Sequence, residues 1–206
     1  MAQEDRPQLY LLTPPAFDLE VFPSQLAKVL DAVEVACIRL TMATKDEDQI
    51  GRAADACRMV AHERDVALVI ETHLKLVERH GLDGVHLTDA ARTIRYARKE
   101  LGADAIVGAW CADSRHDGMN AAEAGADYVC FGPVGQTALG TGTPAELDLF
   151  QWWSEMIEVP VVAEGALTPE LIRTLTPMTD FFAIGEEIWN TEDPAQALRA
   201  LVAAMG

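Results

Sequence analysis

Short apolar runs and longer amphipathic segments alternate along the chain with a period of roughly 25 residues. The apolar runs are almost unbroken, which is typical of parallel strands that are buried on both faces of a sheet. They predict strands at residues 8–12, 35–40, 66–70, 84–87, 105–110, 128–131, 159–163 and 180–184. The amphipathic segments predict helices at 23–33, 46–64, 74–79, 90–101, 114–124, 145–157, 168–175, 186–189 and 194–205.

This alternation places the chain in the α/β class, and eight strand–helix units are the number that closes a (β/α)8 TIM barrel. The same pattern would also suit a doubly wound open sheet, which is the alternative architecture. We expect a single domain over residues 1–206, because no linker or low-complexity segment interrupts the pattern. Ligands of such barrels bind at the carboxyl ends of the strands, so the residues that follow each strand are the candidates for function.

Composition narrows the range of partners. The chain has 16 Lys and Arg against 33 Asp and Glu, a net charge of −17. This argues against nucleic acids and anionic membranes as partners but not against a small anion that is held locally, and the expected partner is a small-molecule substrate. The N-terminus lacks a signal-peptide pattern, and no apolar run reaches the length of a membrane span. The cysteines have no C-x-x-C spacing, so we expect reduced thiols and a cytoplasmic location; they are Cys37, Cys57, Cys111 and Cys130.

A glycine-rich loop follows the strand predicted at 128–131. It contains Gly132 and Gly135, then Thr137, and ends near Thr143 and Pro144, which are expected to be the N-cap and first residue of the next helix. A strand, a glycine loop and a helix start in this order can present backbone N–H groups to an anion. The alternative is a long connection whose glycines serve only to provide positive φ angles.

Three segments resemble the thiamine phosphate synthase family and its thiazole tautomerase relatives: GLDGVHL at 81–87, GADYVCFGPV at 125–134 and PVVAEGAL at 160–167. The resemblance extends from about residue 9 to residue 189. It implies a TIM barrel that is often a homo-oligomer. It also implies a reaction that joins hydroxymethylpyrimidine diphosphate to thiazole phosphate, with Mg²⁺ assistance and release of pyrophosphate. That chemistry depends on neutralising the charge of the leaving group.

The resemblance assigns candidate catalytic residues to the ends of the second and third strands. Of the family pattern Gln-x-Arg-x-Lys at the second strand, only Arg39 is retained. Where the family has Asn-Asp-Arg at the third strand, this chain has Glu71, Thr72 and His73. Arg39, Glu71 and His73 are therefore the catalytic candidates that the resemblance implies.

Both Mg²⁺-binding aspartates of the family are replaced, because their positions hold Thr72 and Ala91. Glu71 and Asp89 lie one and two residues away and are the candidates for a shifted metal pair, since Mg²⁺ uses one or two carboxylates plus substrate phosphates. A shift by one residue at a strand end turns a side chain to the opposite face, which weighs against this pair. Mg²⁺ is the expected cofactor if the synthase reaction is retained, and otherwise none is expected.

The phosphate-binding end of the family is also altered. Thr137 matches the first threonine of the family's Thr-x-Thr-Lys loop, but the lysine has no counterpart, while Gly165 keeps a backbone donor beside Glu164. Glu186 and Glu187 begin the short helix at which the family binds phosphate. Two unit charges ~4 Å apart repel by ~4 kcal/mol at an effective dielectric of ~20. We therefore expect phosphate to bind poorly.

The leading hypothesis is a thiamine phosphate synthase-like protein with a degenerate metal and phosphate site. The alternatives are a diverged family member that acts on a neutral or cationic small molecule, and a binding or regulatory protein without catalysis. The residues expected to contact the substrate are Gly132, Gly135, Thr137, Glu164, Gly165 and Glu186.

Overall fold

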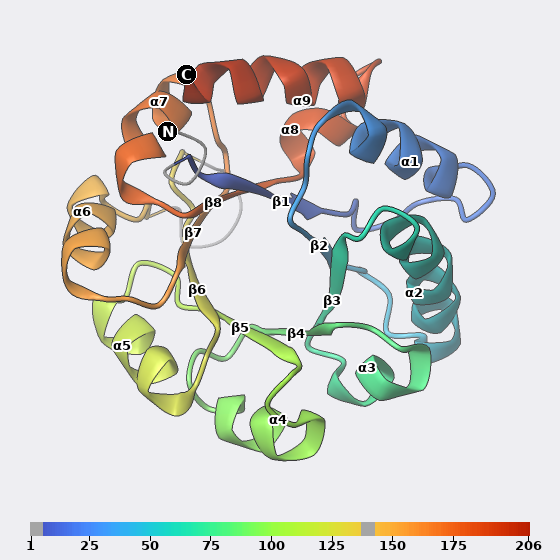
Figure 1. Cartoon of the computed structure of the whole chain (residues 1–206), viewed down its shortest axis with the longest axis horizontal. Coiled ribbons are helices and arrows are strands. Elements are labelled where there is room, and N and C mark those ends of the chain that lie inside the picture. Colours follow the sequence, from blue (N-terminus) through green and yellow to red (C-terminus); the bar gives the residue numbers. More distant parts are fainter. Residues whose placement is uncertain (1–5, 137–142) are drawn as a thin grey trace.

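A closed barrel of eight parallel strands forms the centre of the molecule in the computed structural model, which describes residues 6–136 and 143–206 (Figure 1). Each strand pairs with the next one in the sequence, and β8 pairs with β1 to close the ring. The strands are β1 Gln8–Leu12, β2 Cys37–Leu40, β3 Ala67–Glu71, β4 Gly84–Leu87, β5 Ile106–Trp110, β6 Tyr128–Phe131, β7 Val161–Glu164 and β8 Phe181–Ile184. The predicted TIM barrel is confirmed, and the open doubly wound sheet is excluded.

Helices surround the barrel as an outer ring (Figure 1). They are α1 Phe22–Ala32, α2 Glu47–His62, α3 Leu74–His80, α4 Ile94–Leu101, α5 Arg115–Ala124, α6 Leu147–Met156, α7 Pro169–Leu175, α8 Glu186–Trp189 and α9 Pro194–Val202. Short 3₁₀ turns follow α7 and α9, at Thr176–Met178 and Ala203–Met205. In the described part of the chain, no helix combines the length and the apolar character needed to cross a membrane.

The strands divide their side chains between two cores, as the alternation of a β-strand requires. On β6, Val129 and Phe131 belong to the large core between barrel and helices, whereas Tyr128 and Cys130 point into the barrel. The barrel interior is filled by Tyr10, Cys37, Val69, Tyr128, Cys130, Val162 and Ala183. The four cysteines are free and buried, in agreement with the expected reduced thiols.

Three aspartates that immediately precede strands have the same structural role. Asp83 Oδ2 accepts from the N–H of Leu68 at 2.7 Å, and Asp127 Oδ2 accepts from Val107 at 2.7 Å. In the same way, Asp180 Oδ2 accepts from the N–H of Val161, in β7, at 2.8 Å. Each carboxylate satisfies a backbone donor near the amino end of the preceding strand, so these acids stabilise the barrel and lie at the end opposite to the carboxyl ends.

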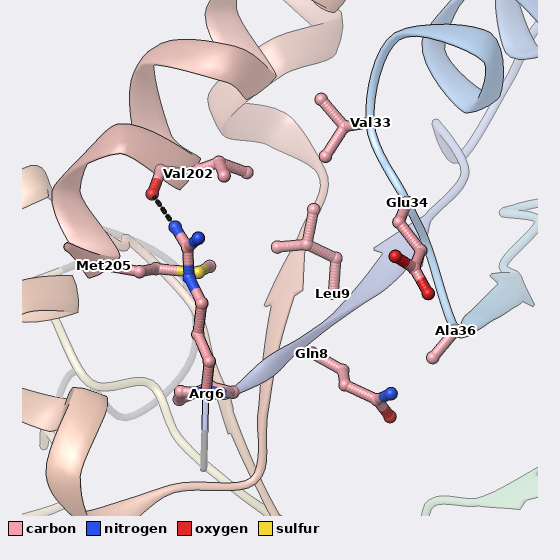
Figure 2. Close-up of a pocket in the computed structure, with 9 residues that line it drawn as sticks. Arg6, Gln8, Leu9, Val33, Glu34, Ala36, Val202 and Met205 are labelled. Carbon is pink, nitrogen blue, oxygen red and sulfur yellow. Dashed lines mark hydrogen bonds between the residues drawn. The ribbon is translucent and has the colours of Figure 1, made fainter. Parts of the chain in front are cut away.

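The amino-terminal end of the barrel also joins the start of the described chain to the last long helix. Figure 2 shows Arg6 reaching α9, where Nη2 donates to the carbonyl oxygen of Val202 at 2.7 Å. A cavity of about 290 Å³ lies here, and Leu9 and Met205 are among its lining residues. Carbonyl groups at the end of a helix have no partner within that helix, so the Arg6 contact caps α9.

The helix after the glycine loop begins later than predicted. Helix α6 starts at Leu147, with Glu146 as the N-cap residue, so the assignment of Thr143 as N-cap and Pro144 as first helical residue is wrong. The backbone N–H of Ala145 instead donates to Pro133 O at 2.7 Å, and Glu146 before the helix is extended. The glycine loop therefore does not run directly into a helix N-terminus.

Candidate active site

A cavity of about 710 Å³ opens at the carboxyl ends of the strands, where TIM barrels bind their ligands. We refer to it as the mouth. Its wall includes Leu12 of β1 and Trp110 of β5, together with residues that follow β6, β7 and β8. Of the residues predicted to contact substrate, those that line the mouth are Gly132, Glu164, Gly165 and Glu186. Thr137 lies outside the described residues, and Gly135 lies next to the wall.

Glu164 connects the mouth to the barrel interior. Its Oε1 accepts from Nη2 of Arg39 at 2.6 Å, and its Oε2 accepts from the Cys130 thiol at 3.0 Å. The side chain of Arg39 is only 4% exposed and that of Glu164 15%. Glu164, in the wall of the mouth, thus holds the predicted catalytic residue Arg39 beneath the mouth. The Nη2 group of the guanidinium is already hydrogen-bonded within the protein.

The charge on Arg39 is stable despite its burial. Burial alone would lower its pKa, but the carboxylate of Glu164 raises the pKa of Arg39 well above its usual value. Glu71 lies on the other side, with Oε2 3.7 Å from Arg39 Nε, which is an ion pair without hydrogen-bond distance. Burial raises the pKa of Glu71, and Arg39 opposes that rise. Two acids, from β3 and β7, therefore share one buried cation.

Hydrogen bonds also connect Arg39 with side chains of the barrel interior. Arg39 Nη1 lies 2.8 Å from His86 Nε2, and His86 Nδ1 lies 2.9 Å from the Tyr128 hydroxyl. Because a guanidinium can only donate, Nε2 accepts and Nδ1–H donates to Tyr128. Tyr128 in turn shares a hydrogen bond with Tyr10 at 2.5 Å.

Burial, reinforced by the charge of Arg39, lowers the pKa of His86 well below its usual value. The imidazole is therefore neutral near pH 7, in agreement with its acceptor role at Nε2. His86 is 1% exposed and packs inside the barrel with both ring nitrogens hydrogen-bonded.

The two glycines at the start of the loop after β6 permit close approach between loops. A Cβ at Gly132 would lie 2.3 Å from Glu164 O, and one at Gly135 would lie 2.2 Å from Ala166 O. Their N–H groups donate to Ala112 O at 3.1 Å and Gly165 O at 3.0 Å, respectively. These two N–H groups are hydrogen-bonded to the protein itself, so any contact of these glycines with a substrate would have to use other atoms.

Glu187 bridges two loops of the mouth. Its Oε1 accepts from the N–H of Leu167, in the loop after β7, at 3.0 Å, and its Oε2 accepts from the N–H of Gly185, directly after β8, at 2.9 Å. Glu186 is exposed and Glu187 is half-buried, and both line the mouth. The short helix α8 thus begins with two carboxylates, one of which holds backbone donors of the protein.

The remaining candidates lie on the opposite side of the barrel from Glu187. Glu71 ends β3, and His73 is the half-buried residue before α3, with its N–H donating to Glu71 O at 2.7 Å. Asp89 lies in the loop after β4, where Oδ2 accepts from the Thr93 hydroxyl. The structure therefore brings Arg39 and Glu71 together and gives His73 and Asp89 local contacts.

Glu71 and Asp89 do not fit a resident Mg²⁺ site. Within residues 6–136 and 143–206, no three His, Cys, Asp or Glu side chains are placed so that they could hold a metal ion. Glu71 already faces the Arg39 cation, and Asp89 uses one oxygen on Thr93. A divalent ion at Glu71 would lie close to a fixed positive charge, which is unfavourable.

Several members of the site were not identified from the sequence. Tyr10, Tyr128 and Cys130 lie in apolar strand segments, and Asp113 lines the mouth although the sequence pattern does not single it out. Strand alternation would have placed Tyr128 and Cys130 on one face, but nothing local indicates which partners they meet across the barrel.

A family model and individual relatives among known proteins identify the same family for this chain. The family model described as thiamine monophosphate synthase matches residues 9–185. The thiamine-phosphate synthase of Rhodospirillum centenum is 44% identical over 187 residues, which cover 89% of this chain and 89% of the relative. That of Hyphomonas neptunium is 39% identical over 206 residues, which cover 95% and 92%.

A solved structure, thiamine phosphate pyrophosphorylase from Pyrococcus furiosus, superimposes with a TM-score of 0.83 at 21% identity, covering 96% of this chain and 95% of that one. At this identity the likeness concerns the fold alone. The family match covers most of the chain, and the first two relatives share more than a third of their residues with it. The chain belongs to the thiamine monophosphate synthase family.

Proposed function

We propose that this protein acts in thiamine biosynthesis and catalyses the thiamine-phosphate synthase reaction, joining hydroxymethylpyrimidine diphosphate to thiazole phosphate. The observation that carries the proposal is the 44% identity to a thiamine-phosphate synthase over 89% of both chains. The mouth is the place for this chemistry, because it lies at the carboxyl ends of the strands and has room for a small substrate.

The charges of the mouth suit the cationic stage of this reaction. The pyrimidine C–O bond breaks and its electron pair leaves with diphosphate, so a carbocation is formed. The lone pair of the thiazole nitrogen then forms the new C–N bond, and a thiazolium cation results. Glu164, Glu186 and Glu187 line the mouth and supply negative potential there, which stabilises both cations. Arg39 is a positioning residue, because it acts through Glu164 and Glu71.

We also propose that five residues contact the substrate: Gly132, Gly135, Thr137, Gly165 and Glu186. For His73 we propose a local role. Mg²⁺ is not assigned to any protein ligand, since Glu71 and Asp89 do not fit such a site. We also propose a cytoplasmic homo-oligomer, which size-exclusion chromatography with light scattering would test.

The direct experiment is an assay of thiamine phosphate formation from the two substrates in buffer that contains Mg²⁺. Product is expected with the wild-type protein, and Glu164→Gln should lower kcat by on the order of tenfold to a hundredfold, because a charge that stabilises the cation is removed. Glu192→Gln, an exposed acid outside the lining of the mouth, is the matched control and should retain full activity. Absence of product with the wild-type protein would contradict the proposal.

A second candidate function is favoured by the charge of the mouth. Asp113, Glu164, Glu186 and Glu187 line it, and no Lys or Arg is among the described lining residues. Such a wall favours a neutral or cationic molecule over a phosphate ester. Calorimetry with the thiazole alcohol and the hydroxymethylpyrimidine, neither of which carries phosphate, would detect this. Tight binding of these compounds without turnover of the phosphorylated pair would favour the second function.

A further inference from the structure

Two donors from the barrel interior hold the carboxylate of Glu164. Nη2 of Arg39 donates to Oε1 at 2.6 Å, and the thiol of Cys130 donates to Oε2 at 3.0 Å. Burial raises the pKa of Cys130 well above its usual value, so the thiol keeps the proton that it donates. Because each oxygen has its own donor, the carboxylate is fixed in orientation as well as in position.

The same carboxylate keeps acceptor capacity for a ligand. A carboxylate offers about four lone-pair sites to donors. Among the described residues, Arg39 and Cys130 are the side chains that donate to Glu164. The side chain of Glu164 is 15% exposed and lines the mouth. Glu164 is thus an immobilised hydrogen-bond acceptor in the wall of the cavity.

An aromatic side chain lies close to this acceptor. Trp110 ends β5, is half-buried and lines the mouth. Gly132 lies between the two residues, because a Cβ added there would be 3.0 Å from the Trp110 ring and 2.3 Å from the backbone oxygen of Glu164. An indole ring and a charged acceptor therefore border the same part of the mouth. Pockets for planar ring ligands combine aromatic walls with a few fixed polar groups in this way.

We propose that Glu164 recognises the pyrimidine ring of the diphosphate substrate: its carboxylate accepts an N–H of the ring's amino group, while Trp110 packs against the ring. The chemical class that fits is a planar aminopyrimidine, which has N–H donors at its edge and apolar faces. Cys130 is a positioning residue, because it acts through Glu164. The inference rests on the proposed function, since that function supplies the pyrimidine substrate. It assigns the ring alone and places no restriction on where the phosphate groups bind.

The proposed contact becomes stronger as the reaction proceeds. When the C–O bond breaks, its electron pair leaves with diphosphate and the methylene carbon becomes electron-deficient. The amino group on the adjacent ring carbon shares this deficit through the ring, so its N–H groups become better donors. A fixed carboxylate at Glu164 then stabilises the transition state more than the ground state, and no proton has to be transferred.

The experiment measures the affinity of the full chain for two phosphate-free ligands by chemical-shift titration. One is the hydroxymethylpyrimidine, and the other is its analogue with hydrogen in place of the amino group. Wild-type protein is expected to bind the amino compound tighter by on the order of tenfold or more, and Glu164→Gln should reduce this preference to about threefold or less, because the charged acceptor is lost. Asp113→Asn removes a charge from the same wall and should keep the preference. Equal preferences in wild type and Glu164→Gln would overturn the inference.

Two variants of Cys130 test how Glu164 is held, and they also serve if Glu164→Gln does not fold. Cys130→Ser keeps a donor for Oε2 and should keep the preference for the amino compound, whereas Cys130→Ala loses the donor and should lower the preference severalfold. Equal preferences in the serine and alanine variants, or no preference in the wild-type protein, would refute the proposed contact. No turnover is measured, so a failed synthase assay and a failed inference are separate outcomes.

Discussion

Arg39 of β2 and Glu164 of β7 form an ion pair of 2.6 Å between strands on different sides of the barrel ring. The arginine side chain is 4% exposed and the acid 15%. Because both charges have left bulk water, each depends on the other. The pair holds the Glu164 carboxylate at the wall of the mouth. This one interaction therefore contributes both to the stability of the fold and to the geometry of the candidate site.

Replacing Arg39 with Met is expected to lower the free energy of unfolding by about 3–5 kcal/mol, since removal of one partner leaves a buried charge uncompensated. The change would also deprive His86 of its donor. Equilibrium unfolding in urea, followed by circular dichroism, measures the loss.

The control for that experiment is Arg64→Met. Arg64 also pairs with an acid at 2.7 Å, but its partner Asp31 is 62% exposed. An exposed ion pair contributes little to stability, so the urea midpoint should stay close to that of the wild type. If both variants lost the same stability, burial of the Arg39 pair would not be the cause.

The neutral state of His86 predicts a loss of stability in acid. Burial, together with Arg39, lowers the pKa of His86 in the folded chain, whereas the unfolded chain has the ordinary value. The unfolded chain therefore binds the extra proton first as the pH falls. His86 should reduce the free energy of unfolding by about 1.4 kcal/mol per pH unit below about 6.5, and have no such effect above it.

The measurement compares wild type and His86→Gln by urea unfolding between neutral and mildly acidic pH. Titration of carboxylates affects both proteins alike, so the difference between their slopes isolates His86. His86→Gln is expected to have a lower free energy of unfolding at neutral pH, and that free energy should change less as the pH falls. Identical slopes would mean that the pKa of His86 is the same in the folded and the unfolded chain, so that burial does not lower it.

The fold was readable from the sequence because its information is local. Each strand is an apolar run that ends at polar or glycine residues, and β4 and β6 have the boundaries that the sequence predicted. Helix starts were less certain: α4 begins at Ile94, because the turn after Asp89 has a positive φ of 55° at Ala90. A single residue with positive φ interrupts a helical backbone, and an alanine in that conformation cannot be recognised from the sequence.

The site was harder to read because its contacts are distant in the sequence. Arg39 and Glu164 are 125 residues apart, and no spacing rule connects them. The resemblance identified both residues but gave Arg39 a substrate-facing role, whereas the structure uses its guanidinium on Glu164 and His86. The acidic start of α8 was also visible, yet the bonds that Glu187 makes to two loops depend on how β7 and β8 are placed.

Burial predicts that the cysteines are unreactive in the native protein. Burial raises the pKa of Cys37, Cys57 and Cys111 to about 12 and raises that of Cys130 well above its usual value. The thiolate is the nucleophile, so a disulfide reagent at mildly alkaline pH should label none of the four within minutes. Unfolding in urea should expose all of them. Rapid labelling of even one native thiol would contradict this.

Glu71 and Asp89 lead to a prediction about Mg²⁺ that separates the resemblance from the structure. The Arg39 guanidinium lies 3.7 Å from Glu71, so a divalent ion at that carboxylate would meet a positive charge. At roughly 5 Å and an effective dielectric of ~20 the repulsion is about 7 kcal/mol. Asp89 alone, with one oxygen on Thr93, is too few ligands for a hard cation.

Titration of Mg²⁺ alone into the protein is therefore expected to give no saturable heat, and Glu71→Gln and Asp89→Asn should give the same result as wild type. Arg39→Met supplies the sharper comparison, because it removes the competing cation while leaving both acids in place. Mg²⁺ binding that appears in Arg39→Met would show that the guanidinium is what keeps the ion out. A saturable wild-type isotherm that Asp89→Asn abolishes would instead establish the shifted metal pair, and the structural argument against it would be wrong.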